Sequence, residues 1–429
     1  MAVTDNEHLF TYMRHRHLLI SFAVLLFGLG ISYGCGDEPE ITPVSVILFG
    51  DIRLSSQSQI DSFLLKKEHP IVILGDLIIG SYRTSRGNDI RNLAGLASLK
   101  TVYGNLIIVG AEHLADFDGL QSLDFIGGKL LIVGNDSLIN IDGLNNLKTI
   151  GGDLDIIANP LLENIDGLSS MNSSISDLEI KENKSLTNID GLHSLTEIKE
   201  DLNIWDNEKL ENVDGLQNIK SIGGDIIMFG NSLLKDLNFL LNFKEIYGTL
   251  YISGYSEFNN LEFMSNLAFV RGAMSLSDLD RLTDLQGLNN LTKVGRSLRI
   301  SGNHSLTSLK GLDNLIEVNR GFCDGLPCDG NAYSLFIGHN KLLTTLEGTS
   351  LKRIKGYLYI ENNASLVTLE GLHLLDSLTG KVFIRNNESL NDFCAIRSVI
   401  TNDWNGDFHT EGNLYNPTLM DLKNGRCRD

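Results

Sequence analysis

Apolar residues return every two or three positions along most of this chain, a spacing typical of short strands joined by bends. In the segment Gly143 to Asp166, which reads GLNNLKTIGGDLDIIANPLLENID, the residues Leu154, Asp155 and Ile156 alternate apolar, polar and apolar. That alternation predicts a half-buried strand, and the Gly-Gly pair ahead of it predicts a turn. No apolar run in the segment has the period of about 3.6 residues that a packed helix shows. The pattern therefore predicts an all-β protein.

This segment is one of many nearly equal repeats. The position of a Gly-Leu pair, occupied by Phe or Cys in three repeats, returns every 24 residues, and every 23 residues after an insertion at about 319–333. One repeat cannot bury its own apolar residues, whereas stacked repeats pair each strand with the turns above and below it. We therefore expect a parallel β-helix, a solenoid of about thirteen coils of 23–24 residues. The repeats begin at Gly95, Gly119, Gly143, Gly167, Gly191, Gly215, Phe239, Phe263, Gly287, Gly311, Gly348, Gly371 and Cys394.

An asparagine also returns at one place in most repeats. Stacked amides at a bend can hydrogen-bond to one another along the solenoid, so we expect an inward ladder, broken by Tyr255 and Leu279. Several of these residues start sequons, such as Asn183-Lys-Ser, and glycosylation is the less favoured alternative. The residues are Asn135, Asn159, Asn183, Asn207, Asn231, Asn303, Asn340, Asn363 and Asn387.

The unit GGDLDIIANPLLENIDGLNNLKTI resembles the leucine-rich repeat of receptor L domains, the ligand-binding modules of the insulin and epidermal growth factor receptors. It is closer still to bacterial surface lipoproteins with L-domain-like coils. The resemblance covers roughly Val46 to Cys427. It implies a right-handed β-helix whose front end is closed by a short helix, and Ser56-Gln57-Ser58-Gln59 has the pattern of a capping box for that helix. This chain has more coils than one receptor L domain, so the receptors' ligand sites cannot be transferred to it.

The N-terminus has the pattern of a targeting segment. A basic stretch, Met13 to His17, precedes the apolar stretch Leu18 to Gly34, and Cys35 follows directly. A small residue and a Cys after an apolar run resemble a bacterial lipobox, so we expect 1–34 to be a signal peptide and Cys35 to be lipidated. Residues 35–45 then form an acidic tether, which is either a surface-export signal or a solvated linker. Met13 is an alternative start.

These observations predict the cellular location of the protein and the boundaries of its parts. We expect a lipid anchor at Cys35 in the outer membrane, with the solenoid exposed at the cell surface; a periplasmic or secreted protein is the alternative. The expected parts are an N-terminal cap with first strands at 46–92, the coils at 93–393 and a C-terminal cap at 394–429.

The cysteines agree with an oxidising compartment. If Cys35 carries lipid, four of the five cysteines remain, and three pairings are possible. The most local pairing joins Cys323 to Cys328 within the insertion and Cys394 to Cys427 across the tail. Zinc at Cys323 and Cys328 is the weaker alternative, because no second ligand pair stands beside them.

Charge and composition restrict the partners. The net charge of −19, without a basic stripe, makes nucleic acid and anionic lipid headgroups poor partners. The histidines are scattered and there is no phosphate loop or paired-His metal helix, so we expect neither catalysis nor a cofactor.

Two columns of aspartates are the strongest sign of chemistry. They suit turn capping better than calcium binding, which is kept as the alternative. A carbohydrate-active β-helix enzyme would need two carboxylates and a Lys or Arg that converge, and the sequence places no such group. The columns are Asp153, Asp177, Asp201 and Asp225, and Asp118, Asp142, Asp166, Asp190 and Asp214.

The outward residues of the predicted L-x-I strands are unusually apolar and aromatic. A solvated sheet face would carry Thr, Lys, Glu and Ser there. Either a flanking segment covers this band, or the band binds a ligand, as exposed aromatic patches on sheets do. The band comprises Ile107, Leu131, Ile227, Tyr251, Phe336, Tyr359 and Phe383 on the strands, and Val109, Val133, Ile157, Trp205 and Phe229 one residue beyond them.

We therefore predict a non-enzymatic cell-envelope lipoprotein that presents a β-helix to an extracellular protein or glycan. The alternatives are a carbohydrate-active enzyme or glycan-capture protein and, third, a structural envelope component. The predicted contacts are Trp205, Ile227, Phe229 and Tyr251, and a second group, Phe336 and Tyr359, beside the insertion.

Overall fold

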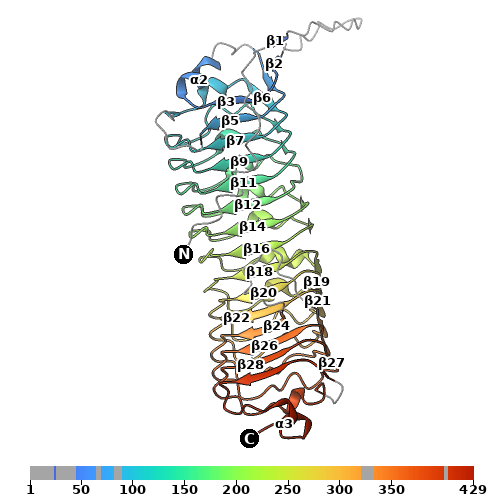
Figure 1. Cartoon of the computed structure of the whole chain (residues 1–429). Coiled ribbons are helices and arrows are strands. Elements are labelled where there is room, and N and C mark those ends of the chain that lie inside the picture. Colours follow the sequence, from blue (N-terminus) through green and yellow to red (C-terminus); the bar gives the residue numbers. More distant parts are fainter. Residues whose placement is uncertain (1–23, 26–44, 64–68, 82–88, 320–332, 401–403) are drawn as a thin grey trace, which may run out of the picture.

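A computed structural model describes residues 24–25, 45–63, 69–81, 89–319, 333–400 and 404–429. These residues form a β-solenoid of about 14 turns, so the predicted stack of parallel coils is confirmed. Figure 1 shows one column of strands that runs from the blue N-terminal end to the red C-terminal end.

One side of the column is a parallel sheet of 15 strands, which we call the long sheet. Equivalent residues of successive repeats are directly paired: Leu154 lies between Leu130 and Leu178. The strands are β3 (Ile52–Leu54), β5 (Leu77–Gly80), β7 (Leu106–Val109), β9 (Leu130–Val133), β11 (Leu154–Ile157), β12 (Leu178–Lys181), β14 (Leu202–Trp205), β16 (Ile226–Phe229), β18 (Leu250–Ser253), β20 (Met274–Ser277), β22 (Leu298–Ser301), β24 (Tyr333–Gly338), β26 (Tyr357–Glu361), β28 (Val382–Arg385) and β29 (Phe408–Glu411).

Shorter strands form the second face, which is divided into three sheets. Val24 and Leu25, within the predicted signal peptide, pair antiparallel with β2. The sheets contain β1 (Val24–Leu25), β2 (Val46–Leu48), β4 (Ile71–Ile73), β6 (Leu99–Val102), β8 (Phe125–Ile126) and β10 (Thr149–Ile150); β13 (Glu197–Ile198) and β15 (Ser221–Ile222); and β17 (Glu245–Ile246), β19 (Phe269–Val270), β21 (Lys293–Val294), β23 (Glu317–Val318), β25 (Arg353–Ile354) and β27 (Ser377–Leu378).

Short 3-10 helices occupy the corner where most of the repeats begin. Their glycines are required by close packing, because a Cβ atom at Gly191 would collide with the carbonyl oxygen of Ile165 in the preceding turn. The helices are η2 (Ala94–Leu96), η3 (Asp142–Leu144), η4 (Asp166–Leu168), η5 (Asp190–Leu192), η6 (Asp214–Leu216), η7 (Asn238–Asn242), η8 (Glu262–Met264) and η9 (Cys394–Ile396).

The predicted asparagine ladder is confirmed and lies inside the solenoid. Asn183 is fully buried; its side-chain amide donates to the carbonyl oxygens of Ile156 and Lys181, and its Oδ1 accepts the backbone N–H of Asn159. A side chain held in this way is not accessible to a glycosyltransferase. The break at Tyr255 is partial, because its hydroxyl accepts a hydrogen bond from Asn231.

A short helix, α2 (Gln57–Asp61), lies near the N-terminal end of the column and packs against η2 (Figure 1). Ser56 is its N-cap and accepts the N–H of Gln59. The reciprocal bond of a capping box is shifted by one residue, because Gln59 Oε1 accepts the N–H of Ser55.

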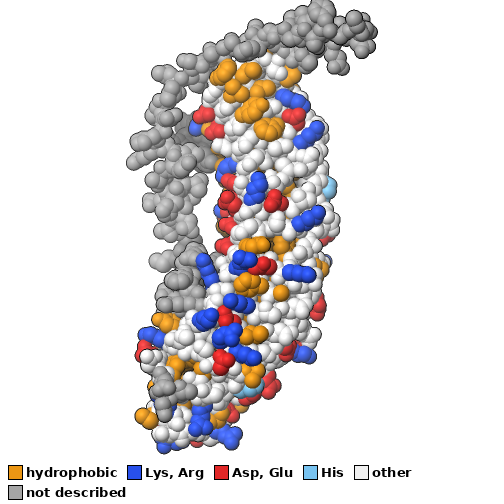
Figure 2. Space-filling model, turned by 90° about the vertical axis from the view of Figure 1, so that its right-hand side faces the viewer, with side chains coloured by type: hydrophobic (Ala, Val, Ile, Leu, Met, Phe, Trp, Pro, Cys, Tyr) orange, Lys and Arg blue, Asp and Glu red, His pale blue; other side chains and the backbone are white. Residues whose placement is uncertain are grey.

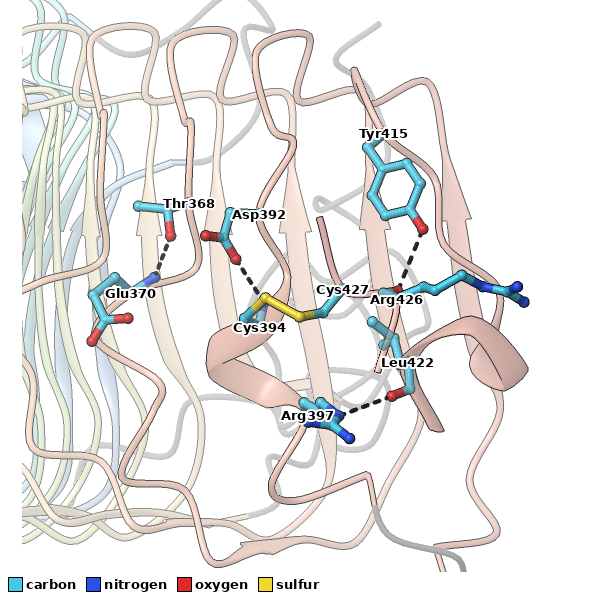
Figure 3. Close-up of a disulfide and its surroundings, with 9 residues drawn as sticks. All are labelled: Thr368, Glu370, Asp392, Cys394, Arg397, Tyr415, Leu422, Arg426 and Cys427. Atoms are coloured by element: carbon cyan, nitrogen blue, oxygen red, sulfur yellow. Dashed lines mark hydrogen bonds between the residues drawn. A yellow bond between two sulfur atoms is a disulfide. The ribbon is translucent and has the colours of Figure 1, made fainter. Parts of the chain in front are cut away.

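At the other end, the disulfide Cys394–Cys427 is present, as predicted, and joins the tail to the last turns (Figure 3). Helix α3 (Leu419–Lys423) follows β29, and Arg397 donates to the carbonyl oxygen of Leu422. Cys35, Cys323, Cys328 and most of the insertion lie outside the described residues.

Candidate ligand-binding face

Three aromatic rings lie together on the outward face of the long sheet. Trp205 and Phe229 are paired as the fourth residues of β14 and β16, and Tyr251 is the second residue of β18. We expected Trp205 and Phe229 one residue beyond the strands; the structure includes them, and second and fourth residues of a strand point to the same side. The three side chains, which we call the ring platform, are therefore on one face.

The rings of the platform are in mutual contact. The ring centroids of Trp205 and Phe229 are 5.2 Å apart and their planes differ by 10°, whereas Tyr251 meets Phe229 edge-on at 6.0 Å. Lys181 Nζ lies 4.8 Å from the centroid of the Trp205 ring. All three aromatic side chains are half-buried, as is the predicted neighbour Ile227, so each keeps part of its surface for a ligand.

Polar groups border the ring platform. Lys181 forms an ion pair of 2.7 Å with Glu179, and both are only partly exposed. Asp206 follows Trp205 in a left-handed turn conformation, and burial and the neighbouring Glu208 raise the pKa of its carboxyl. Fixed donors and acceptors beside flat rings are the arrangement that recognises hydroxyl-bearing ligands.

The second predicted group is buried. Phe336 is 3% exposed and Tyr359 is 5% exposed, so neither offers surface to a ligand in this arrangement. They form the middle of a stack that continues through Phe383 to His409, whose rings are 4.9 Å apart, with Arg299 over Phe336 at 4.3 Å. The 24-residue period indicated Phe383, but His409 was missed because the tail was expected to be a cap.

The N-terminal part of the outward band forms a separate apolar cluster. Ile107, Val109 and Leu131 are at most 8% exposed, and Ile78, Val133 and Ile157 pack against them. These side chains pack against one another on the outward side of the strands, so they do not form an open contact surface.

The first aspartate column caps turns, as expected. Asp177 and Asp201 each accept the backbone N–H of the equivalent residue one turn later, at 2.7 Å. Burial raises the pKa of Asp201 in spite of the hydrogen bond from the Asp225 backbone, and the negative charges of Asp225 and Asp177 add to the increase. The aspartates of the second column are exposed; Asp118 lies in a turn, and the other four begin 3-10 helices. Among the described residues, no group of three or more His, Cys, Asp or Glu side chains could hold a metal ion.

The expectation that two carboxylates and a basic residue do not converge is wrong at one place. Lys129 Nζ lies 2.6 Å from Asp155 and 4.0 Å from Asp153. Burial raises the pKa of Asp155 in spite of the hydrogen bond from Lys129. Burial also acts to lower the pKa of Lys129, but the bond to Asp155 and the surrounding carboxylates leave it raised.

The expected absence of a basic stripe is also wrong. Figure 2 shows lysines and arginines gathered on the middle and lower part of the second face. Strand pairing places Lys293, Glu317 and Arg353 in one row across β21, β23 and β25. With Arg271 and Lys355, the cations of this row make up what we call the basic stripe.

No protein-family model matches this chain, and no curated protein matches it either. Within the ranges that the structure describes, none of the helices has the length and apolar content needed to cross a membrane.

Proposed function

We propose that this protein is a non-enzymatic binding protein that presents the ring platform to an extracellular glycan or protein. The observation that carries the proposal is the flat stack of Trp205 on Phe229, with Tyr251 beside it, on the outward face of a rigid sheet. Aromatic rings supply a large contact area at low entropic cost, and Trp and Tyr are enriched where proteins bind partners.

The proposal places the protein in the cell envelope, attached through lipid at Cys35, with the solenoid at the cell surface. This placement is supported by the predicted signal peptide at 1–34 and by Cys35 directly after its apolar stretch. The resemblance of the repeat to L-domain-like lipoproteins supports it as well. The disulfide Cys394–Cys427 is consistent with an oxidising compartment. Mass spectrometry of the mature N-terminus and protease shaving of whole cells test the placement; an unmodified Cys35 would remove the anchor.

The binding test uses the full chain with Trp205→Ala, Phe229→Ala and Tyr251→Ala combined. A glycan array and a cell-attachment assay should lose signal with this variant. The matched control combines Phe49→Ala, Tyr103→Ala and Leu342→Ala, which remove exposed apolar side chains elsewhere and should bind normally. Unchanged binding by a folded platform variant contradicts the proposal.

A carbohydrate-active enzyme is the second candidate, favoured by the convergence of Lys129, Asp153 and Asp155 on the side of the long sheet. A lysine and carboxylates can act as base and acid on a uronate or glycoside. Incubation with defined polysaccharides and detection of new reducing ends tests this candidate. Cleavage that is lost in Lys129→Ala would favour the enzyme over the binding protein.

A further inference from the structure

The basic stripe is built around one nearly buried carboxylate. Glu317 has a side-chain exposure of 7%, and three cations converge on it: Arg353 at 2.6 Å, Lys293 at 3.1 Å and Lys355 at 3.2 Å. The cations themselves are 42–51% exposed. One negative charge therefore holds three positive charges in place, and the group has a surplus of positive charge that faces solvent.

Glu317 is a permanent member of this group. The hydrogen bond from Arg353, with those from Lys293 and Lys355, lowers the pKa of Glu317 to about 2 against the opposing effect of burial. Because the carboxylate stays ionised at neutral pH, the three cationic side chains are oriented before any ligand arrives, which reduces the entropy cost of binding.

Two aromatic rings lie beside cations of the stripe. Arg271 lies over the ring of Tyr247 at 4.7 Å, and Lys293 lies over Phe269 at 5.8 Å. Phe269 pairs with Lys293 in the strand register, so this ring and this cation are one strand spacing of about 4.8 Å apart along the column. Flat apolar surface beside a group of cations suits a chain of sugar rings that carries acidic groups.

Charge is unevenly distributed along the solenoid. Residues 111–230 contain 22 acidic and seven basic residues, whereas residues 231–390 contain 16 acidic and 15 basic residues. The net negative charge is therefore concentrated in the N-terminal half, and the basic stripe lies in a nearly neutral half. A polyanion can approach this half without strong repulsion.

We infer that the second face binds a linear anionic polysaccharide, carboxylated or sulfated, which lies along the basic stripe. Lys293, Arg353 and Lys355 contact its acidic groups, and Tyr247 and Phe269 contact its sugar rings. Arg271 is paired with Glu245 at 2.6 Å and borders the site. Nucleic acid is a poorer match, because its dense phosphates exceed the few cations of the stripe and would extend toward the acidic half. This surface is separate from the ring platform on the long sheet.

The test measures binding of the full chain to polygalacturonate, heparin, neutral dextran and single-stranded DNA. The stripe variant combines Lys293→Gln, Glu317→Gln, Arg353→Gln and Lys355→Gln, which removes the carboxylate with its cations and leaves no unpaired buried charge. It should bind polygalacturonate or heparin at least about tenfold more weakly, since exposed ion pairs contribute up to ~1 kcal/mol each. The control Lys148→Gln with Lys209→Gln changes net charge equally and should bind normally.

A single substitution keeps the test informative if the stripe variant does not fold. Glu317→Gln removes only the central negative charge. The added net positive charge should outweigh the lost orientation of the cations and tighten binding of the acidic polymers at low salt; unchanged or weaker binding would overturn the inference. Equal binding by the wild type and a folded stripe variant, binding of dextran as tight as that of the acidic polymers, or preference for DNA would each overturn the inference. The variant that lacks the ring platform should bind the acidic polymers as the wild type does. Failure of one proposal can therefore be told apart from failure of the other.

Discussion

The indole ring of Trp205 lies flat on the phenyl ring of Phe229, with centroids 5.2 Å apart, although 24 residues separate them in sequence. The contact exists because the two residues are paired in the register of β14 and β16. Every repeat thus brings equivalent residues into direct contact, and a column of side chains becomes a surface.

Removal of the phenyl ring should expose the indole. In a Trp404→Phe background, Trp205 is the only Trp of the chain. Phe229→Ala in this background should increase acrylamide quenching of Trp205 fluorescence and lower the free energy of unfolding by at least about 0.5–1.5 kcal/mol, the aromatic pair's share. Tyr251→Ala, which removes a ring that meets Phe229, should leave the quenching nearly unchanged.

Loss of one ladder amide should destabilise the solenoid strongly. Asn183→Ala leaves the backbone N–H of Asn159 and the carbonyl oxygen of Ile156 without their partner in the core. We expect a loss of about 3–5 kcal/mol, measured by urea unfolding, because each unsatisfied buried group costs about 1–3 kcal/mol. The exposed Asn172→Ala should change stability by less than about 0.5 kcal/mol. Equal effects would argue against the ladder.

The anchor glycines should tolerate no side chain. A methyl group at Gly191 collides with the backbone of the preceding turn, and Gly191→Ala should cost about 3 kcal/mol or more. Gly134→Ala is the comparison: its Cβ meets nothing within 4 Å, and only its positive φ of 63° opposes the change. That variant should lose about 1–2 kcal/mol. The reverse order in thermal melts would refute close packing as the cause.

The disulfide should hold the C-terminal end of the column. Cys394 and Cys427 are separated by 33 residues, and Cys394→Ser with Cys427→Ser should lower stability by about 2–4 kcal/mol. Hydrogen exchange should increase first at β29 and α3, because they follow the last repeat. Uniform loss of protection along the whole column would contradict a local role.

The lowered pKa of Glu317 should make the stability of the protein depend on pH in the acid range. The folded-state pKa is lowered from 4.5 to about 2, so the stabilisation is fully present above about pH 4.5 and is lost as the pH falls toward about 2. The free energy of unfolding of the wild type should therefore decrease more across this interval than that of Glu317→Gln. Parallel curves for the two proteins would show that the three cations do not stabilise the carboxylate.

Much of this architecture could be predicted because a 24-residue period leaves few arrangements. Once Leu154 and Leu178 occupy equivalent positions, parallel pairing in register follows, and so does the column of Asn159 and Asn183. The Cys394–Cys427 bond could be proposed because local pairing is the simplest solution for two cysteines that bracket a tail.

Other features could not be predicted from position in the repeat. Phe336 and Trp205 both lie on the outward side of the long sheet, yet Phe336 is buried and Trp205 is half-buried. Exposure depends on what neighbouring turns place around a residue. The Lys129–Asp155 pair was missed for a related reason, because a lysine in one bend reaches a residue 26 positions away in the next turn.

The sequence by itself determined the all-β stack, its period, its inner asparagines and the rows in which side chains follow one another, since hydrophobic spacing and repeat length fix the register. Only the tertiary structure decided which rows of outward side chains are exposed to solvent and where side chains of one charge lie together. The net charge of −19 concealed the basic stripe, because electrostatic surplus depends on which carboxylates lie within a few ångströms of each cation.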